Sequence, residues 1–497
     1  MIFCNPHIKL SCIVGLGIGL IYAAFIPPFV PDIDGNAMLE VAVSLVRHQN
    51  FRVTSGTGAL GVDGYYYSKW YPLLSVLAVP FVATGLAIGT ALHLPEYYVA
   101  GVCALTLSTL LTAASAAFIV LLALRLGSDR QMACLAALSF AFGTIALTYA
   151  GSFFAEPLLG FLTISGLYFA TGKTSSATVV ASLLAGIAVL AKPPAAILGP
   201  ILSLYFICKK RSLPIICMPL LATGFFALTY GLYNYMRFGD PLNFGQAWMS
   251  DIPNQIISTK VAAPPSVKLN FWLWLTLKLA TPAQGICGLL FSPGRGLLWY
   301  CPPVVLAGIA LCRTPKNKRL EALTISIIFV GLLLIYSGAW WAGGWAWGPR
   351  YLLPALPGLF VLIALLSKRW KYWLLALTLI GFLVNAPTKV MFYQRYYIEA
   401  IEQNISGKEM LWSFNHAPFR QGWELASRQI NDARKSDVKA LVQSSGKQEL
   451  RGEMTRVVSV WWWMLPAANI PLGVGVAVAC LLIGAGILTI RSGILHF

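Results

Sequence analysis

Apolar runs of about 20 residues recur along almost the whole of this 497-residue chain. A run of that length can cross the hydrocarbon core of a bilayer as a helix. Hydrophobic residues make up 58% of the chain and charged residues only 11%, which is less charge than a soluble domain of this size carries. The sequence therefore predicts an all-α polytopic membrane protein.

We expect about 12 transmembrane helices, because each apolar run is bounded by polar, Gly or Pro residues. The first run ends at Pro27-Pro28 without a small-residue cleavage site, so we interpret it as an uncleaved anchor. The predicted spans are 11–30, 97–124, 131–150, 156–172, 177–191, 195–208, 213–235, 297–312, 321–339, 352–366, 372–386 and 464–490.

Basic residues set the predicted orientation. The net charge of +18 resides in short Lys/Arg clusters between apolar runs, a pattern typical of cytoplasmic loops rather than of nucleic-acid binding. All these clusters fall inside only if both termini are cytoplasmic and the apolar stretch 71–94 does not cross fully. We therefore expect 71–94 to be a re-entrant or surface-lying helix pair. The predicted outside segments are 31–96, 151–155, 192–194, 236–296, 340–351 and 387–463.

Two of these outside segments contain expected helices. The stretch 267–280 combines terminal lysines with tryptophans and could lie in the outer membrane interface. The stretch 424–442 also reads as a helix, followed by a turn at 444–446.

Three carboxylates stand out in a chain with few acids. Asp32 and Asp34 precede an amphipathic segment, 35–42, that we expect to lie on the membrane surface as a helix. Glu156, followed by Pro157, lies at the outer end of another predicted helix. Each could cap a helix N-terminus. Each could instead serve chemistry, as a general base does when it removes a proton from a hydroxyl.

Four outside cations accompany these acids. Lys69 lies among aromatic residues, Lys192 precedes Pro193-Pro194, and Arg295 and Arg350 lie in Gly/Pro turns. Individually they could be interfacial anchors or snorkelling side chains. Together they would suit a phosphate or pyrophosphate group.

Other site classes find little support. The ten cysteines form no CxxC pattern, and the five histidines are dispersed without metal-ligand spacing. No phosphate-binding GxxxxGK[ST] motif is present, so ATP-driven transport has no support. An Asn404-Ile405-Ser406 sequon carries little weight because such matches are common.

These motifs, in this order, resemble those of the GT-C superfamily of integral-membrane glycosyltransferases. The resemblance covers about the first 370 residues and is nearest in pattern to lipid A aminoarabinose transferases, protein O-mannosyltransferases and the Rgt-like bacterial branch. The family's acidic pair corresponds to Asp34-Gly35 here, with Asp32 two residues earlier. The other motifs that carry the resemblance are Ser68-Lys69-Trp70-Tyr71-Pro72, Glu156-Pro157, Lys192-Pro193-Pro194, Arg237-Phe238-Gly239-Asp240-Pro241, Ser292-Pro293-Gly294-Arg295-Gly296 and Arg350-Tyr351-Leu352-Leu353-Pro354.

The resemblance implies a GT-C-type helix bundle whose first outer loop carries surface helices, and an inverting sugar transfer from a polyprenyl-phosphate donor. The acceptor would be an extracytoplasmic glycan, lipid or protein. Asp34 or Asp32 would be the base, with Glu156 as a further acid. Lys69, Lys192, Arg295, Arg350 and Tyr351 would bind the donor phosphate. No cofactor is required for certain, and a divalent metal stays open because the superfamily includes both kinds of enzyme.

The predicted organisation has three parts: a catalytic transmembrane module at 1–386, a small extracytoplasmic domain at 387–463, and a final helix with a cytoplasmic tail at 464–497. We expect a multi-pass protein of the plasma (inner) membrane with its active site on the extracytoplasmic face. The alternative function is a lipid or polysaccharide transporter or flippase. That reading would require charges near the middle of the membrane, whereas most charges here lie at one surface or the other.

Overall fold

A computed structural model describes residues 5–245, 282–338, 341–444 and 454–496. Within these residues the chain is an all-α bundle, with one two-stranded hairpin as its only sheet, so the predicted fold class is confirmed. The predicted interfacial helix at 267–280 and most of the turn at 444–446 lie outside the described residues.

The first half of the chain contains the first loop and the helices around it. Its elements are α1 (Pro6–Ala23), α2 (Ile33–His48), β1 (Ala59–Leu60), β2 (Tyr66–Tyr67), α3 (Pro72–Ala91), α4 (Glu96–Arg125), α5 (Arg130–Phe142), α6 (Ala146–Tyr149), α7 (Ala155–Ala170), α8 (Ser175–Ala191), the 3₁₀ helix η2 (Pro193–Ile197), α9 (Leu198–Cys208) and α10 (Leu213–Phe238).

The second half is more broken and contains many 3₁₀ turns, written η. Its elements are α12 (Pro282–Phe291), α13 (Leu297–Tyr300), η4 (Pro302–Val304), α14 (Val305–Arg313), η5 (Lys316–Lys318), α15 (Arg319–Tyr336), η6 (Arg350–Ala355), α16 (Leu356–Ala364), η7 (Lys368–Trp370), α17 (Lys371–Asn385), η8 (Ala386–Lys389), α18 (Gln394–Glu402), α19 (Gly407–Trp412), α20 (Pro418–Arg434), α21 (Val438–Ser444), η10 (Met454–Arg456), η11 (Trp461–Ala468) and α22 (Leu472–His496).

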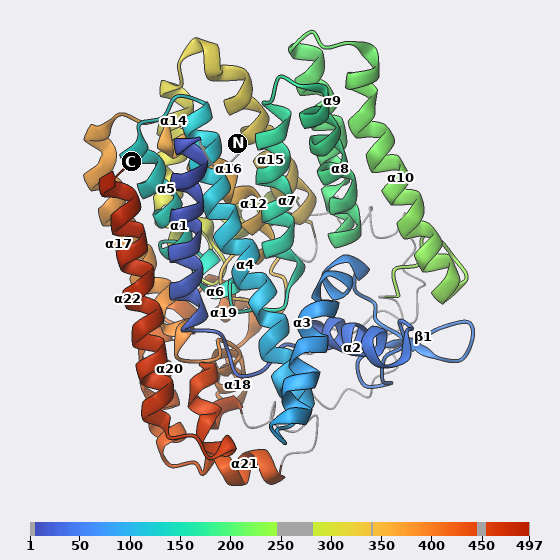
Figure 1. Ribbon diagram of the computed structural model, residues 1–497, viewed down its shortest axis with the longest axis vertical. Coiled ribbons are helices and arrows are strands. Elements are labelled where there is room, and N and C mark those ends of the chain that lie inside the picture. The colour runs from blue at the N-terminus through green and yellow to red at the C-terminus, as the bar shows by residue number, and fades with distance from the viewer. Residues whose placement is uncertain (1–4, 246–281, 339–340, 445–453, 497) are drawn as a thin grey trace.

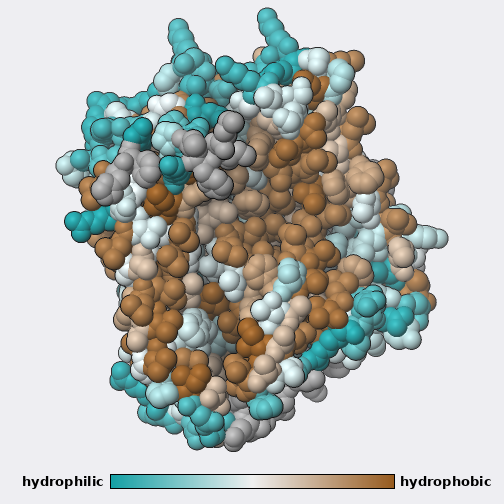
Figure 2. Space-filling model, in the orientation of Figure 1, coloured by the Kyte–Doolittle hydropathy of each residue, from teal (hydrophilic) through white to brown (hydrophobic). Residues whose placement is uncertain are grey.

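The surface is that of a membrane-embedded bundle. A broad hydrophobic band lies between two hydrophilic ends (Figure 2). Large apolar side chains face outward on the peripheral helices, including Leu228 of α10 at 77% exposure and Leu481 of α22 at 72%. Such exposure suits contact with lipid tails.

By length and hydropathy, six described helices could cross a membrane, or seven if the bent pair around 390 is one span. The shorter apolar helices, such as α7 and α8, pack between them. The count of about 12 spans therefore stays a prediction. Both termini lie towards the upper end of the view, as does the connection between α9 and α10, while α20 and α21 lie at the lower end (Figure 1).

The prediction of a helix pair at 71–94 is wrong, because the structure has one continuous helix, α3, with Pro80 inside it. This helix packs along the N-terminal part of α4. At Gly85 a Cβ would lie only 2.5 Å from Ala100 Cα. In Figure 1, α3 occupies the lower half of the molecule, whereas α4 continues to the upper end.

Several predicted boundaries also change. The span predicted at 131–150 is interrupted after Phe142, and the one at 464–490 starts only at Leu472, after Asn469 in a left-handed conformation. The helix at 424–442 is two helices, α20 and α21. The short helix α12 and the β1–β2 hairpin of the first loop were not predicted. A helix was predicted correctly at 35–42 and extends further, as α2. Its apolar residues do not lie on the membrane surface as predicted, because they pack into the bundle, where Met38, Leu39 and Val41 are at most 3% exposed.

Candidate active site

Glu156 is the centre of a buried ion cluster. It lies in the first turn of α7 and is only 2% exposed. Its Oε1 accepts a hydrogen bond from Lys192 Nζ at 2.7 Å and lies 3.3 Å from Arg350 Nε. Phe154, not Glu156, occupies the N-cap position of α7, so Glu156 does not play the capping role that Pro157 suggested.

Local backbone chemistry brings Lys192 to this point. Pro193 and Pro194 cannot continue α8, and the residue before a proline avoids the helical region. Lys192 accordingly adopts an extended conformation, with φ −168° and ψ 122°, and ends α8. The side chain is thereby directed into the bundle, where it is 8% exposed.

Aromatic rings surround the two cations. Lys192 Nζ lies 4.4 Å from the ring centre of Tyr351 and 5.2 Å from that of Tyr336, and these two rings are stacked at 4.6 Å. The Arg350 guanidinium lies 4.1 Å from the ring of Phe154. Cation–π contacts of this kind hold a charge without consuming its hydrogen-bond donors. Among the described residues, Arg350 Nε is buried without a hydrogen-bond acceptor.

Asp34 lies in the first turn of α2 and interacts electrostatically with this cluster. Burial and the charge of Glu156 raise the pKa of its carboxyl above the ordinary 3.8, while the charges of Arg350, Lys69 and Lys192 act in the opposite direction. These charge interactions bring together Asp34, Lys69, Glu156, Lys192 and Arg350 from distant parts of the sequence. The carboxylate of Asp34 makes no hydrogen bond or ion pair with any described residue.

The backbone next to Lys69 is fixed by Arg237, the first residue of the Arg237-Phe238-Gly239-Asp240-Pro241 motif. Arg237, at the end of α10, is 3% exposed and donates to the carbonyl oxygen of Ser68, to Asn234 Oδ1 at 2.7 Å and to the carbonyl of Tyr233 at 3.1 Å. Burial lowers the pKa of the Lys69 ammonium, and the charge of Asp34 raises it.

Asp32 has a different environment. It occupies the N-cap position of α2, but its side chain makes no capping bond. Its Oδ1 accepts instead from Tyr393 Oη at 3.0 Å and from Gln394 Nε2 at 2.5 Å. Burial raises the pKa of this carboxyl to about 6, partly opposed by these two hydrogen bonds and by Arg350.

Arg295 is not joined to the Glu156 cluster by any contact between described residues. Its guanidinium donates to three backbone carbonyls, those of Ala342 at 2.7 Å, Gly344 at 2.6 Å and Gly294 at 2.9 Å. Since those carbonyls occupy its donors, this arginine fixes the turn that leads towards Arg350. Its predicted contact with a phosphate stays a prediction.

Sequence reasoning missed Tyr336, Phe154, Tyr393 and Gln394. Phe154 lay inside the motif that identified Glu156, so an aromatic neighbour could have been suspected there. Tyr393 and Gln394 lie in no recognisable motif, and only the three-dimensional arrangement brings them to Asp32.

Two of the cavities in the described part of the molecule differ in position relative to this cluster. The larger, of about 570 Å³, lies between α2, the loop after it and the start of α4. Its walls combine aromatic and polar side chains, among them Phe29, Asn36, Glu40, Arg47 and Tyr97. It adjoins the helix that carries Asp34.

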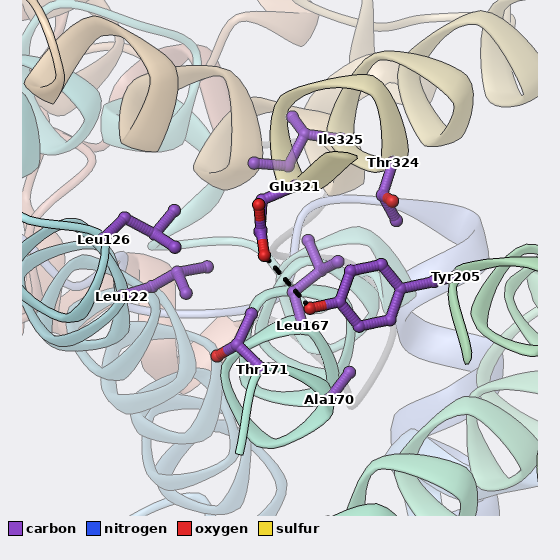
Figure 3. Close-up of a pocket in the computed structure, with 9 residues that line it drawn as sticks. All are labelled: Leu122, Leu126, Leu167, Ala170, Thr171, Tyr205, Glu321, Thr324 and Ile325. Atoms are coloured by element: carbon purple, nitrogen blue, oxygen red, sulfur yellow. Dashed lines mark hydrogen bonds between the residues drawn. The ribbon is translucent and has the colours of Figure 1, made fainter. Parts of the chain in front are cut away.

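The smaller cavity, of about 10 Å³, lies away from this cluster, between the apolar residues of α4 and α7 and the polar pair Tyr205 and Glu321 (Figure 3). Glu321 accepts from Lys209 Nζ at 2.6 Å and from Tyr205 Oη at 3.3 Å. The space holds about one water molecule. It has no part in the arrangement around Asp34.

Among the described residues, no group of three or more His, Cys, Asp or Glu side chains is arranged to hold a metal ion. The functional groups that the site does offer are carboxylates, cations and aromatic rings. This set can bind an anion and accept a proton next to it.

Comparisons with known proteins give structural likeness only. No family model matches the chain, and no curated protein matches its sequence. The chain is similar to the crystal structure of ArnT from Cupriavidus metallidurans bound to undecaprenyl phosphate, with 13% identity, a TM-score of 0.49, and coverage of 96% of this chain and 77% of that one. It is also similar to the archaeal oligosaccharyltransferase AglB from Archaeoglobus fulgidus in complex with an inhibitory peptide and a dolichol-phosphate, with 11% identity, a TM-score of 0.47, and coverage of 90% and 59%.

Proposed function

We propose that this protein transfers a sugar, a hexose or a pentose, from a polyprenyl-phosphate donor to an acceptor on the extracytoplasmic side of the plasma (inner) membrane. The observation that supports the proposal is the carboxylate of Asp34, which has no hydrogen bond or ion pair to a described residue and interacts electrostatically with three buried or half-buried cations, Lys69, Lys192 and Arg350. A base beside an anion site is what sugar transfer from a lipid phosphate requires.

In the proposed reaction, Asp34 removes the proton from the acceptor hydroxyl. The resulting oxygen attacks the anomeric carbon from the face opposite the phosphate. The bond between that carbon and the phosphate oxygen breaks, and the configuration inverts. The negative charge that develops on the leaving phosphate is stabilised by the cations.

Each cation has a distinct part in the proposal. Lys192 and Arg350 share Glu156, which keeps two like charges close together in a buried place. Arg350 Nε lies 3.3 Å from Glu156 Oε1 in an ion pair without hydrogen-bond geometry, and Lys69 belongs to the first loop. The cavity of about 570 Å³ beside α2 is large enough for part of an acceptor.

Of the two aspartates, Asp34 is the proposed base. Asp32 Oδ1 already accepts two hydrogen bonds, from Tyr393 and Gln394, which reduces its ability to take a proton from a substrate. Asp34 has no such donors in the described part of the chain.

The test uses a strain that lacks the gene. Lipid-linked sugars should accumulate in it, and mass spectrometry would identify both sugar and carrier. The wild-type gene should clear them, whereas Asp34→Asn should lower transfer by about 100-fold, the usual scale of general-base catalysis. Asp63→Asn, a change at an exposed aspartate of the same loop, is the matched control.

Two results would contradict the assignment. If Asp34→Asn complements fully while Asp32→Asn does not, the base is Asp32. If neither substitution matters, or if no lipid-linked sugar accumulates, the proposed reaction is wrong.

A further inference from the structure

The loop that precedes Asp34 and ends at Asp32 is contacted along its length by residues of the last quarter of the chain. It connects α1 to α2 and runs from Ala24 to Asp32. The contacts are Trp461 Nε1 to the Ala23 carbonyl at 2.9 Å, Trp462 Nε1 to the Ala24 carbonyl at 2.9 Å, Trp461 N to the Ile26 carbonyl at 2.7 Å, Phe392 stacked on Phe29 at 4.8 Å, and Tyr393 and Gln394 on Asp32.

The residues that hold Asp32 are themselves fixed. Arg395, the next residue after Gln394, is 6% exposed and pairs with Glu399 at 2.6 Å and with Asp432 at 2.6 Å. It also donates to Gln429 Oε1 at 3.2 Å. The start of α18 is therefore tied to α20, and Gln394 has little freedom to move away from Asp32.

The contact between Gln394 and Asp32 has features that protein stability alone does not explain. Asp32 Oδ2 and Gln394 Oε1 are both buried without a donor among the described residues. A buried acceptor without a donor destabilises the folded protein, and an apolar pair of similar shape would avoid that cost. Because this polar pair lowers the stability of the fold, we explain it by a second role, which is to hold the start of α2 in place.

The same contact decides how α2 begins. Because Asp32 is turned towards Gln394, it does not cap α2, and Asp34 follows two residues later in the first turn. Gly35 is pressed against its neighbours, since a Cβ there would lie 2.6 Å from Val30 Cγ1 and 3.2 Å from the carbonyl oxygen of Phe153. The start of α2 is thus confined on two sides.

We infer that Gln394 and Tyr393 are positioning residues of the active site, which act through Asp32 to hold the Asp34 carboxylate towards Lys69 and Arg350. The inference rests on the proposed function. It assigns these two residues to the base, because both donate hydrogen bonds to Asp32 and neither makes a hydrogen bond or ion pair with Lys192 or Arg350 in the described structure.

The kinetic experiment follows the release of polyprenyl phosphate from a synthetic polyprenyl-phosphate sugar by the full-length protein in detergent, with a membrane extract of the strain that lacks the gene supplying the acceptor hydroxyl. Gln394→Met should lower kcat by about 10- to 100-fold, the cost of a misplaced catalytic group. KM for the donor should not change, because the cation cluster is intact. Tyr393→Phe should lower kcat less, since it removes the weaker of the two bonds. Gln403→Met, at an exposed glutamine directly after the same helix, should have no effect.

A second readout does not need activity. Infrared difference spectra between wild type and Asp32→Asn report the protonation of the Asp32 carboxyl, whose pKa is about 6. Gln394→Met removes the side-chain amide that donates to the Asp32 carboxylate. The pH at which the Asp32 carboxyl is half protonated should therefore rise in this variant. If the protein released no polyprenyl phosphate at all, the proposed function would fail, while the titration would still decide whether Gln394 controls Asp32.

Two outcomes overturn the inference. One is an unchanged kcat together with an unchanged titration midpoint in Gln394→Met. The other is a lower thermal stability with kcat unchanged, which would make Tyr393 and Gln394 part of the framework and nothing more.

Discussion

At the scale of single residues, Glu156 balances the charge of the cluster. It is the shared partner of Lys192 and Arg350, and all three side chains are buried. Removal of one member of a buried pair costs about 3–5 kcal/mol, because the remaining charge lacks compensation. The members of this cluster differ in their number of partners, since Glu156 has two cationic partners and Lys192 has one acidic partner.

We therefore expect Glu156→Gln to destabilise the protein by about 3–5 kcal/mol, and Lys192→Met to destabilise it less because Arg350 still pairs with Glu156. The double variant should be more stable than the sum of the two losses predicts. Thermal unfolding in detergent measures these differences, with Glu402→Gln at an exposed site as control. Equal unfolding temperatures for Glu156→Gln and the control would contradict the buried pairing.

The pH dependence of transfer belongs to the same scale. A base works only when ionised, so activity should be full at high pH and fall as the pH drops through the pKa of Asp34, which burial raises above 3.8. The charge of Lys69 lowers that pKa. Lys69→Met should therefore shift the acidic limb of kcat/KM to higher pH, whereas Lys69→Arg and the exposed control Lys408→Met should not. A shift to lower pH would exclude Asp34 as the base.

The sequence identified the charged residues because charge is rare in an apolar chain. Glu156, Lys192 and Arg350 each interrupt or border an apolar run, and the structure brings them together. Gln394 and Tyr393 carry no such mark, since uncharged polar residues at a helix start are common. Their role depends on a contact across 362 residues of sequence, which no local pattern encodes.

At the scale of elements, the sequence predicted helices better than it predicted their breaks. Apolar runs gave the positions of most helices, including α2. The run at 71–94 was assigned to a helix pair because charge bias disfavoured a crossing. The structure has one helix there, α3, which lies beside only part of α4 and is long and apolar enough to cross a membrane, so whether this segment crosses stays a prediction. Charge bias constrains which side a loop lies on, and says little about the shape of the segment between.

The contact between α3 and α4 depends on small residues. A Cβ at Gly85 would lie 2.5 Å from Ala100 Cα and 2.8 Å from the carbonyl oxygen of Val99, both backbone atoms. Gly85→Val should force the helices apart and cost at least the ~1–3 kcal/mol of an overpacked core. Gly224→Val on α10, where a Cβ meets nothing within 4 Å, should be tolerated. Unfolding temperatures in detergent test the pair, and similar values for both variants would contradict the close approach of α3 and α4.

At the scale of the whole molecule, the candidate active site lies towards one end of the bundle and the basic connection between α9 and α10 lies at the other. The acids and cations of the site join the first loop to α7, η2 and η6, while the connection between α9 and α10 and the two termini lie towards the other end (Figure 1). If the basic end is cytoplasmic, as the charge bias predicts, the site faces outward.

Cysteine labelling tests this orientation. In a background without native cysteines, Lys210→Cys should react with an impermeant reagent only after permeabilisation, and Asn415→Cys should react in intact cells. The reverse pattern would place the proposed active site in the cytoplasm. Reaction of both in intact cells would contradict a bundle that separates the two ends.

The grip of Trp461 and Trp462 on the Ala23 and Ala24 carbonyls also bears on how the molecule is made. These partners are 438 residues apart, so the loop before Asp32 leaves the ribosome long before its supports are synthesised. Until residues 461 and 462 are made, the loop between α1 and α2 lacks the hydrogen bonds from these two tryptophans. A chain halted after α17 would insert its first helices yet leave its aspartates unanchored. The loop before Asp32 therefore gains these two supports only after residues 461 and 462 have been synthesised.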